Sequence, residues 1–452
     1  MPPPPGQWDP AAGWDQLGAP AGGPAKPRHR GRLLVAAAAV VVLIGGGATY
    51  VAVANPFGSS GTSNSSGGAS SPNAAAQSLV TSLNKGDYAG MVDDLVPAER
   101  DALKLPMQDL ANESKQLDPT GANSSSDLSS ILKLNAQSFT FDPTPDKITD
   151  NVEVVKLTGG TLTYNMDLSK SPAAQQMLQG MLPGSLPAAL TSGSVDISQF
   201  IKDQNNGEPI RIATQKVGDK WYPSLFYTIA DNAANSSGVT DLGAPVPANG
   251  ASSPQDLVTQ LLNAVATQDS RRLIELTSPD EMAALHDYGS VLLQNATAPV
   301  APTFKVTDLS VATKTISGGA TRVTLQSITV QTDSMTVTVK ISGGCLTVSN
   351  GSPGTLTLCA NDVSQYLDQY ASELQITPDQ EKAIADLFTG ALTVGLDVTQ
   401  SGGKWYVNPV RSALDLYGEI FSALTAADLQ ALTTLIQSLA SNYSSMLGGI
   451  LH

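Results

Sequence analysis

The chain contains few residues whose type and spacing could support chemistry. Cys345 and Cys359 are its only two cysteines, and they flank a Gly-rich stretch between two strand-like segments. In an oxidising compartment such a pair forms a structural disulfide, which would stabilise a closed loop of about 15 residues by ~3 kcal/mol. A redox-active pair would have a tighter Cys-x-x-Cys spacing in an electropositive setting. We therefore predict a structural disulfide between these two residues.

One acidic segment has the spacing of a calcium-binding loop. Between Asp142 and Glu153, oxygen-bearing side chains fall at positions that such loops use for ligands. Lys147, however, occupies the position where a calcium loop needs Gly, and Pro143 and Pro145 stiffen the start of the segment. We interpret it as a polar connection that enters a strand, and we predict no metal site.

The three histidines do not form a recognisable catalytic or metal-binding group. His29 lies in a basic segment, and His452 is the last residue given. His286 lies beside Asp287 in a helical segment, where we expect an exposed position. The sequence has no Gly-x-Ser-x-Gly elbow, phosphate-binding loop or His-Glu-x-x-His motif. We predict no catalytic residue and no cofactor, and so a protein that is not an enzyme.

Trp221, Tyr222, Trp405 and Tyr406 are candidates for a binding site. Each pair follows a Lys in a predicted strand, and the two tryptophans are the only ones beyond residue 32. Aromatic side chains can line the mouth of a pocket. Their strand positions favour packing in a core at least as well. Both interpretations stay open, namely a pocket rim formed by these four residues or part of the hydrophobic core.

The composition limits the classes of protein to which this chain could belong. It has 452 residues, with 25 basic and 40 acidic side chains and a formal net charge of -15. This balance argues against a nucleic-acid partner, because phosphate binding requires clustered Lys and Arg. Only 14% of residues are charged and 5% are aromatic, so any core must consist of Ala, Val, Leu and Ile. The length, with 40 Gly and 29 Pro, indicates several modules joined by linkers.

The segment 33–54 is uncharged and apolar, and as a helix of about 33 Å it could cross a bilayer. Basic residues precede it, and because such residues stay in the cytoplasm the rest of the chain is placed outside. They are Lys26, Arg28, Arg30 and Arg32. The alternative is a signal peptide cleaved after Ala54, where the sequence has the small-x-small form of a cleavage site. We predict an uncleaved single-pass anchor in the plasma membrane, with the N-terminus cytoplasmic and the C-terminus outside.

Composition divides the chain into linkers and folded parts. A tail rich in Pro and Gly cannot bury enough apolar surface to fold, which predicts disorder. Two further segments rich in Gly, Ser, Ala and Pro predict flexible tethers. The predicted boundaries are 1–32 for the cytoplasmic tail, 33–54 for the transmembrane helix, 55–74 for a Gly/Ser linker, 75–233 for a first folded part, 234–253 for a second linker and 254–452 for a second folded part with a long C-terminal helix.

The two folded parts repeat each other. Matching blocks keep their order, and the offset between them changes only at loop insertions. Self-similarity of this kind predicts an internal duplication. The aligned pairs include Leu79 with Leu261, Asp87 with Asp269, Pro97 with Pro279, Glu99 with Glu281, and Lys220-Trp221-Tyr222 with Lys404-Trp405-Tyr406.

Each half has the pattern of an α+β domain. Apolar residues at helical spacing in 257–265 predict an amphipathic helix, and a short second helical piece follows. The segment 321–342, rich in Val, Ile and Thr, predicts two antiparallel strands. Residues 412–444 are strongly helical, and Thr425 with Asp428 predicts a cap inside this region.

These elements together resemble the nuclear-transport-factor-like cone fold, which is also called the SnoaL-type fold. The residues that carry the resemblance are 79–88 and 218–222, with their counterparts in the second half. Within that superfamily the chain resembles secreted or membrane-anchored actinobacterial proteins with a Pro-rich tail, one membrane span and such domains outside the cell. The resemblance implies one N-terminal transmembrane helix followed by two duplicated domains, each with helices and a curved antiparallel sheet. Enzymes of this family usually have an Asp–His pair in the cone, and neither half offers a His at a matching site.

This organisation predicts a binding function in the cell envelope. We expect the tandem cone domains to bind another envelope protein or an apolar small ligand, while residues 33–54 hold the chain in the membrane. Two alternatives stay open: an enzyme with an unrecognised site that acts on cell-wall or lipid material, and a purely structural spacer. An open pocket would favour a ligand or a substrate, and a cone filled by its own side chains would favour a spacer.

Overall fold

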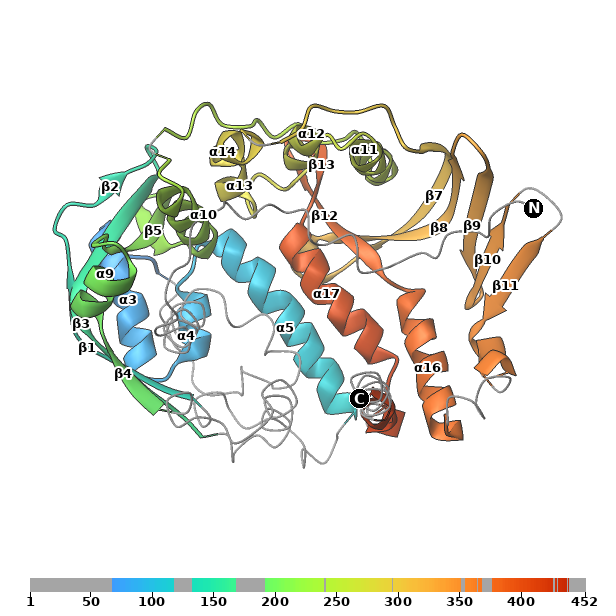
Figure 1. Ribbon diagram of the computed structural model, residues 1–452, viewed down its shortest axis with the longest axis horizontal. Helices are drawn as coiled ribbons and strands as arrows, with labels where there is room; N and C mark the ends of the chain where they lie inside the picture. The colour runs from blue at the N-terminus through green and yellow to red at the C-terminus, as the bar shows by residue number, and fades with distance from the viewer. Residues whose placement is uncertain are drawn as a thin grey trace, which may run out of the picture.

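The fold combines helices with two antiparallel sheets, one of which curls into a half-barrel (Figure 1). The tail 1–32 and the predicted membrane segment 33–54 lie outside the residues that the computed structural model describes. Within the described residues, no helix is both long and apolar enough to span a bilayer. The described residues are 67–117, 132–167, 192–239, 241–294, 296–350, 354–363, 365–367, 376–425, 427–428, 430–436 and 438.

The first half of the described chain, residues 67–239, contains a 6-stranded sheet. Its main path has the order β1-β3-β5-β6, and β2 and β4 both pair with β3. All of these pairs are antiparallel. The strands are β1 (Leu132–Phe141), β2 (Asp146–Lys147), β3 (Val152–Met166), β4 (Ser192–Asp196), β5 (Ile210–Val217) and β6 (Lys220–Pro223).

The second half, from residue 241 onward, contains a 7-stranded sheet. Its path has the order β11-β10-β9-β8-β12-β13, and β7 pairs with the other edge of β8. The strands are β7 (Lys305–Thr315), β8 (Thr321–Gln331), β9 (Thr336–Ser342), β10 (Cys345–Ser349), β11 (Thr355–Cys359), β12 (Gly395–Ser401) and β13 (Lys404–Val407). The predicted strand pair at 321–342 is therefore confirmed as β8 and β9.

The first helix of each half begins with the same local signal. Ser71 and Ser253 are the N-caps of α3 and α11, and a Pro follows each of them, where the missing N–H costs nothing. α3 thus begins inside the predicted linker 55–74, while α11 confirms the predicted helix at 257–265. The helices are α3 (Pro72–Asn84), α4 (Tyr88–Asp93), α5 (Pro97–Leu117), α9 (Ile197–Gln204), α10 (Leu225–Ser236), α11 (Pro254–Ala266), α12 (Ser270–Glu275), α13 (Ala283–Asp287), α14 (Gly289–Leu293), α16 (Pro378–Ala391) and α17 (Pro409–Ser422), with a short 3-10 turn at Ser317–Gly319.

The pairing of four strands recurs in the two halves. β7 and β8 pair as β1 and β3 do, and β12 and β13 continue from β8 as β5 and β6 continue from β3. Backbone hydrogen bonds recur with them at the positions that the sequence blocks align. They are Ala69 with Trp221 and Ala251 with Trp405, Val96 with Pro223 and Ser278 with Val407, and Ser224 with Ala213 and Asn408 with Asp397. The second sheet adds β10 and β11 to this shared framework.

At the contact between the two halves, one helix of each half packs on the closing helix of the other. We call α10 and α17, which follow the last hairpin of each half, the closing helices. α5 of the first half packs on α17 of the second, and α13 of the second half packs on α10 of the first (Figure 1). Tyr227 of α10 and Tyr288, next to α13, meet edge to face, with ring centroids 6.3 Å apart. The Tyr227 hydroxyl donates to Asp287 at 2.6 Å, and the Tyr288 hydroxyl donates to Asp231 at 3.1 Å. Each half therefore completes the core of the other.

The predicted linker 234–253 is partly folded. α10 continues to Ser236, and beyond it Val246 and Ala251 are each only 1% exposed. His286, which we expected to be exposed, is 7% exposed, and its Nδ1 lies 2.9 Å from the carbonyl oxygen of Val246. That expectation was wrong because the returning chain covers the helix surface on which His286 lies.

The predicted cap near the C-terminus is confirmed. The N–H of Thr425 donates to Asp428 Oδ2 at 2.7 Å, and the N–H of Asp428 donates to Thr425 Oγ1 at 3.2 Å. This reciprocal pair satisfies donors that a helix start leaves without intrahelical partners. The last part of the helical region predicted at 412–444 lies outside the described residues.

In the first half, helices of the same half cover one face of the sheet, whereas the described residues cover the second sheet mainly near its base. In the first half, Leu83 of α3 is 2% exposed and packs with residues of β1, β3 and α9. Val265, which aligns with Leu83 in the repeat, is 51% exposed. The second core lies instead around Leu257, Val323 and Val398, under the other end of α11.

Leu83→Ala and Val265→Ala form a matched pair, because the two residues occupy equivalent positions in α3 and α11. We expect Leu83→Ala to lower the free energy of unfolding by about 2–5 kcal/mol, because it leaves a cavity in the first core. We expect Val265→Ala to change it by less than about 0.5 kcal/mol, because that side chain is largely exposed. Urea unfolding of the full chain in mild detergent, followed by tryptophan fluorescence, measures both; equal losses would contradict the difference between the cores.

Candidate binding face

The outer part of the second sheet carries a row of apolar side chains across five neighbouring strands. Residues that are directly paired in antiparallel strands point to the same face of a sheet. The register pairs Leu309 with Ile328, Ile328 with Val339, Val339 with Val348, and Val348 with Leu356. A continuous aliphatic row therefore runs from β7 to β11.

Further apolar rows flank this central one on the same face. On one side β7, β8 and β9 contribute a row, and on the other side β9, β10 and β11 contribute a row. Together with the central row they form what we call the apolar face. Its residues are Val306, Leu309, Ile328, Val330, Val337, Val339, Ile341, Leu346, Val348, Leu356 and Leu358.

The apolar face is largely uncovered by the described residues. Leu309 is its only buried member, at 8% exposure, whereas Leu356 is 55% exposed and the others are partly exposed. The main helix contacts of this sheet are those of α11 with β7 and β13 and of α17 with β12, all near the base. In the first half, by contrast, α3 and α9 cover the sheet with Val80, Leu83, Ile197 and Ile201.

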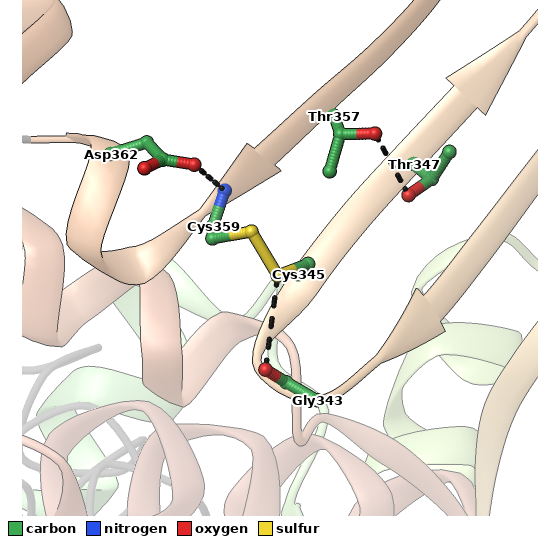
Figure 2. Close-up of a disulfide and its surroundings, with 6 residues drawn as sticks. All are labelled: Gly343, Cys345, Thr347, Thr357, Cys359 and Asp362. Atoms are coloured by element: carbon green, nitrogen blue, oxygen red, sulfur yellow. Dashed lines mark hydrogen bonds between the residues drawn. A yellow bond between two sulfur atoms is a disulfide. The ribbon is translucent and has the colours of Figure 1, made fainter.

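The opposite face of the same strands is polar. Thr329 and Thr338 lie side by side on β8 and β9, with their hydroxyl oxygens 3.0 Å apart. Thr347 and Thr357 do the same on β10 and β11 at 3.2 Å (Figure 2). The exposed Lys340 also lies on this face, because it pairs with Thr347. Strands with one apolar and one polar face are those that cover a core, so the second sheet has the pattern of a covering sheet, and the described residues form no core beneath its outer part.

The predicted disulfide is confirmed, and it lies on the polar face at the outer edge of the sheet (Figure 2). Cys345 and Cys359 are directly paired residues of β10 and β11, and their sulfur atoms are 2.07 Å apart. The N–H of Cys359 donates to Asp362 Oδ2 at 3.3 Å. Because a slip of one residue would turn every side chain to the other face, this cross-link helps to keep the leucines of β11 on the apolar face.

The four aromatic residues singled out in the sequence lie in the late hairpin of each half. Trp221 is 9% exposed, and Lys216 Nζ lies 6.0 Å from the centre of its ring. Trp405 packs against the second core, and Tyr406 is 7% exposed. Tyr222 pairs with Gln215 across the first hairpin and is partly buried. These surroundings are those of core packing, and the interpretation as a pocket rim stays a prediction.

A dense cluster of titratable side chains lies between β8, β12 and α17. Arg322 Nε donates to Asp397 Oδ1 at 2.8 Å, and its other nitrogens contact Asp415 and Glu419. Arg411 Nε lies 3.6 Å from the Asp415 carboxylate and 3.9 Å from that of Asp397. Such convergence of acids and bases is also typical of catalytic sites, so the exposure of these side chains bears on whether a substrate could reach them.

The centre of the cluster is buried, while Arg322 and Glu419 at its margin are 15% and 18% exposed. The side chain of Asp397 has 0% exposure, that of Arg411 has 4%, and that of Asp415 has 8%. Burial, together with the neighbouring Asp397 carboxylate, raises the pKa of Asp415 to about 8. We interpret the cluster as a structural clamp, because its ion pairs join α17 to β8 and β12.

The carboxyl groups of the predicted polar connection also have partners in the protein. Lys156 Nζ lies 2.8 Å from Asp146 and 3.5 Å from Asp142. Arg211 joins Asp146 to Asp231 of α10, at 2.8 Å and 2.5 Å. Arg211 thus clamps the closing helix of the first half, as Arg322 clamps that of the second. They fit the interpretation of this segment as a structural connection that enters β3.

Two buried glutamates cap the closing helices, and sequence reasoning missed their role. Glu99, 3% exposed, accepts from the Ser224 hydroxyl, from the N–H of Leu225 at 2.6 Å and from the N–H of Phe226 at 3.3 Å. A carboxylate at the N-terminus of a helix is favoured by the unpaired N–H groups and by the helix dipole. The sequence did contain a signal of this role, because Glu99 aligns with Glu281 and both halves therefore keep an acidic residue at this position.

Glu281 caps α17 less completely. It is 4% exposed and accepts from the N–H of Val410 at 2.8 Å, but its Oε2 has no hydrogen-bond partner among the described residues. Pro409 aligns with Leu225 and has no N–H to donate, and Asn408 replaces the hydroxyl of Ser224. Burial raises the pKa of both glutamates to about 7, against the opposing effect of the hydrogen bonds.

Comparisons with known proteins identify no relative for this arrangement. No protein-family model, no curated protein and no solved structure matches the chain.

The two glutamates predict a pH dependence of stability. Their folded-state pKa of about 7 lies above the ordinary 4.5, so their contribution to stability is complete below about pH 4.5 and is lost as the pH rises through 7. We expect Glu281→Gln to raise the free energy of unfolding at pH 8, by at most about 1.4 kcal/mol per pKa unit, with a smaller gain at pH 5.

Glu99→Gln is the matched control. The amide removes an acceptor from donors that remain buried, so we expect a loss of about 1–3 kcal/mol at both pH values. Urea midpoints at pH 5 and pH 8 for the two variants and the parent chain measure the effects. A loss at pH 8 for Glu281→Gln as large as that for Glu99→Gln would show that the two caps are equivalent.

Proposed function

We propose that this chain is a membrane-anchored, extracytoplasmic binding protein that holds a neutral apolar molecule on its apolar face. The observation that carries the proposal is the continuous aliphatic surface on β7 to β11, which no described helix covers. Monomeric proteins rarely leave contiguous apolar patches in water, and large patches mark binding sites for ligands, partners or membranes. Of these, the curved sheet favours a ligand.

The size of the face suits a lipid-like molecule. Five strands about 4.8 Å apart and three rows about 6.8 Å apart give an area of roughly 19 Å by 14 Å. One or two acyl chains could lie along it. Covering a partly exposed Val, Ile or Leu contributes about 25 cal/mol per Å² of apolar surface removed from water, so a long-chain ligand would be held mainly by the hydrophobic effect.

The charges favour a neutral ligand over an anionic one. The chain has a net charge of -15, which repels anions at long range. None of the residues of the apolar face is basic, and Lys340, in the middle of β9, lies on the polar face. A fatty acid or phospholipid headgroup would therefore find no cation on this face.

The setting of this site is part of the same proposal. We place residues 33–54 as an uncleaved membrane helix with the C-terminal part outside, on the sequence grounds given above. Two duplicated cone domains of the nuclear-transport-factor-like type are supported by the recurring strand order and recurring backbone hydrogen bonds. In this interpretation the first domain is a filled spacer and the second is the binding domain.

We further propose that the protein is not an enzyme. The centre of the cluster around Arg322 is buried and its charges are paired with one another, and the apolar face has no titratable side chain among its residues. The alternatives are an enzyme that acts on cell-wall or lipid material through a site outside the described residues, and binding of an envelope protein on the same face. The experiment below separates ligand binding from both.

A charge placed on either face of β9 tests the proposal. Val339 is in the central row of the apolar face, and the neighbouring Thr338 points to the polar face, so Val339→Lys and Thr338→Lys are matched variants. We expect the neutral probe Nile red to bind the parent chain, with Val339→Lys weakening its Kd tenfold or more, about 1.4 kcal/mol, and Thr338→Lys leaving it unchanged.

Fluorescence titration of the full chain in a detergent-free nanodisc, with empty nanodiscs as background, gives the affinities. Native mass spectrometry of the purified chain before and after denaturation then identifies a bound molecule by its mass. Equal binding by the two variants, or no binding above the background, would remove the apolar face as a ligand site. A protein that co-purifies with the parent chain and is lost with Val339→Lys would favour the protein-partner alternative.

A further inference from the structure

The outermost strand of the second sheet, β11, has an unusual edge. Edge strands normally carry charges, bulges or a covering segment, because their free N–H and C=O groups could otherwise pair with another chain. Among the described strands, the other edges have such protection. Ala69 and Ala251 pair with β6 and β13, and β7 carries Lys305, Asp308 and Lys314. β1 carries Lys133 and register shifts, β2 has only two residues, both charged, and β4 contains Gly193 and ends at Asp196.

β11 has none of these protections. Its sequence, Thr355–Cys359, contains no charged residue, no Pro and no Gly. Its first three side chains are exposed, including Leu356 at 55%, and no described strand pairs with its outer edge. Figure 1 places β11 at the end of the molecule that is remote from the first half. A second chain could therefore approach this edge from the side away from the first half.

The backbone of β11 shows which groups are free. The N–H of Ala360 donates to the carbonyl oxygen of Gly344 at 3.2 Å, so this pair is hydrogen-bonded to the β10 side. Hydrogen-bonded and non-hydrogen-bonded pairs alternate along an antiparallel ladder. Thr355 and Thr357 therefore direct their N–H and C=O groups away from β10, and these groups have no partner among the described residues.

The free edge of β11 ends at Cys359. The N–H of Cys359 also points away from β10, but it already donates to Asp362 at 3.3 Å (Figure 2). The disulfide between Cys345 and Cys359 holds β11 in register beside β10. The result is a short strand, held in register, in which the backbone N–H and C=O groups of Thr355 and Thr357 point outward.

We propose that β11 pairs antiparallel with β11 of a second copy of this chain, so that the two second sheets join into one sheet across a two-fold axis. The strand is complementary to itself, because leucines alternate with threonines and an antiparallel copy can set leucine beside leucine and threonine beside threonine. The net charge of -15 would repel two copies elsewhere, but this strand is uncharged. Pairing covers Leu356, the most exposed residue of the apolar face.

The contact is small, so the dimer is weak. A pair of five-residue strands buries less than the roughly 1,200 Å² of a stable interface, which places the dimer among transient complexes. The two apolar faces become continuous across the axis. This inference is independent of ligand binding, since the edge and the face are separate features and each can be tested without the other.

Thr357→Pro tests the pairing with little effect on the monomer. Proline removes an N–H that points away from β10, and it is tolerated on the outer edge of a sheet. Thr357→Val is the matched control, because it also removes the hydroxyl but keeps the N–H. Sedimentation velocity over a dilution series of the full chain in mild detergent measures the self-association. We expect the parent chain and Thr357→Val to dimerise and Thr357→Pro to stay monomeric.

A folding check and a second variant keep the test decisive. Circular dichroism and a non-reducing gel show whether Thr357→Pro retains its strands and its disulfide. If it does not, Thr357→Lys replaces it, because it keeps the N–H and places two positive charges near the two-fold axis, where we again expect monomers. A monomeric parent chain at its highest soluble concentration, or a dimer that survives the variant used, would overturn the proposal.

Discussion

A buried carboxyl group at the start of the closing helix ties each half of this protein together. Glu99 lies in the first turn of α5, and Glu281 lies between α12 and α13. They accept hydrogen bonds from N–H groups at the starts of α10 and α17, which lie more than a hundred residues further along the chain. The carboxyl group fixes where the closing helix starts. The same two helices carry Asp231 and Asp415, which the arginine clamps hold, and they contact α13 and α5.

The two halves share this framework but differ in the hydrogen bonds of the cap and in the residues of the core. Pro409 and Asn408 remove donors that the first half supplies, so the second cap is left with an unpaired oxygen. In the second half Arg322 and Asp397 occupy β8 and β12 at a place where the first sheet has only small aliphatic residues, Val154 and Ala213. The second half thus has a buried ionic cluster where the first half has an aliphatic core, and its described residues leave the outer part of its sheet uncovered.

The sequence predicted those features that depend on local spacing. α11, the pair β8 and β9, the disulfide and the Thr425–Asp428 cap all follow from periodicity, residue type or a short motif. It did not predict the burial of His286 or the packing of α5 and α13 on the other half, because both depend on which distant segment covers a surface. The apolar face could be predicted from the sequence only in part. The alternation in β9 shows one apolar side, but only the register of five strands and the absence of a covering described helix show an extended surface.

The packing of helices across the two halves has a consequence for how the chain folds during synthesis. α5 emerges with the first half, but its packing partner α17 lies close to the C-terminal end of the described chain. Until α17 appears, the residues of α5 that will face it have no place in a finished core. The first half alone is therefore an incomplete folding unit, and one of its cores also lacks Ala284 and Tyr288, which come from the second half. A chain interrupted between the halves would yield a fragment whose sheet is formed but whose α5 has lost its partner.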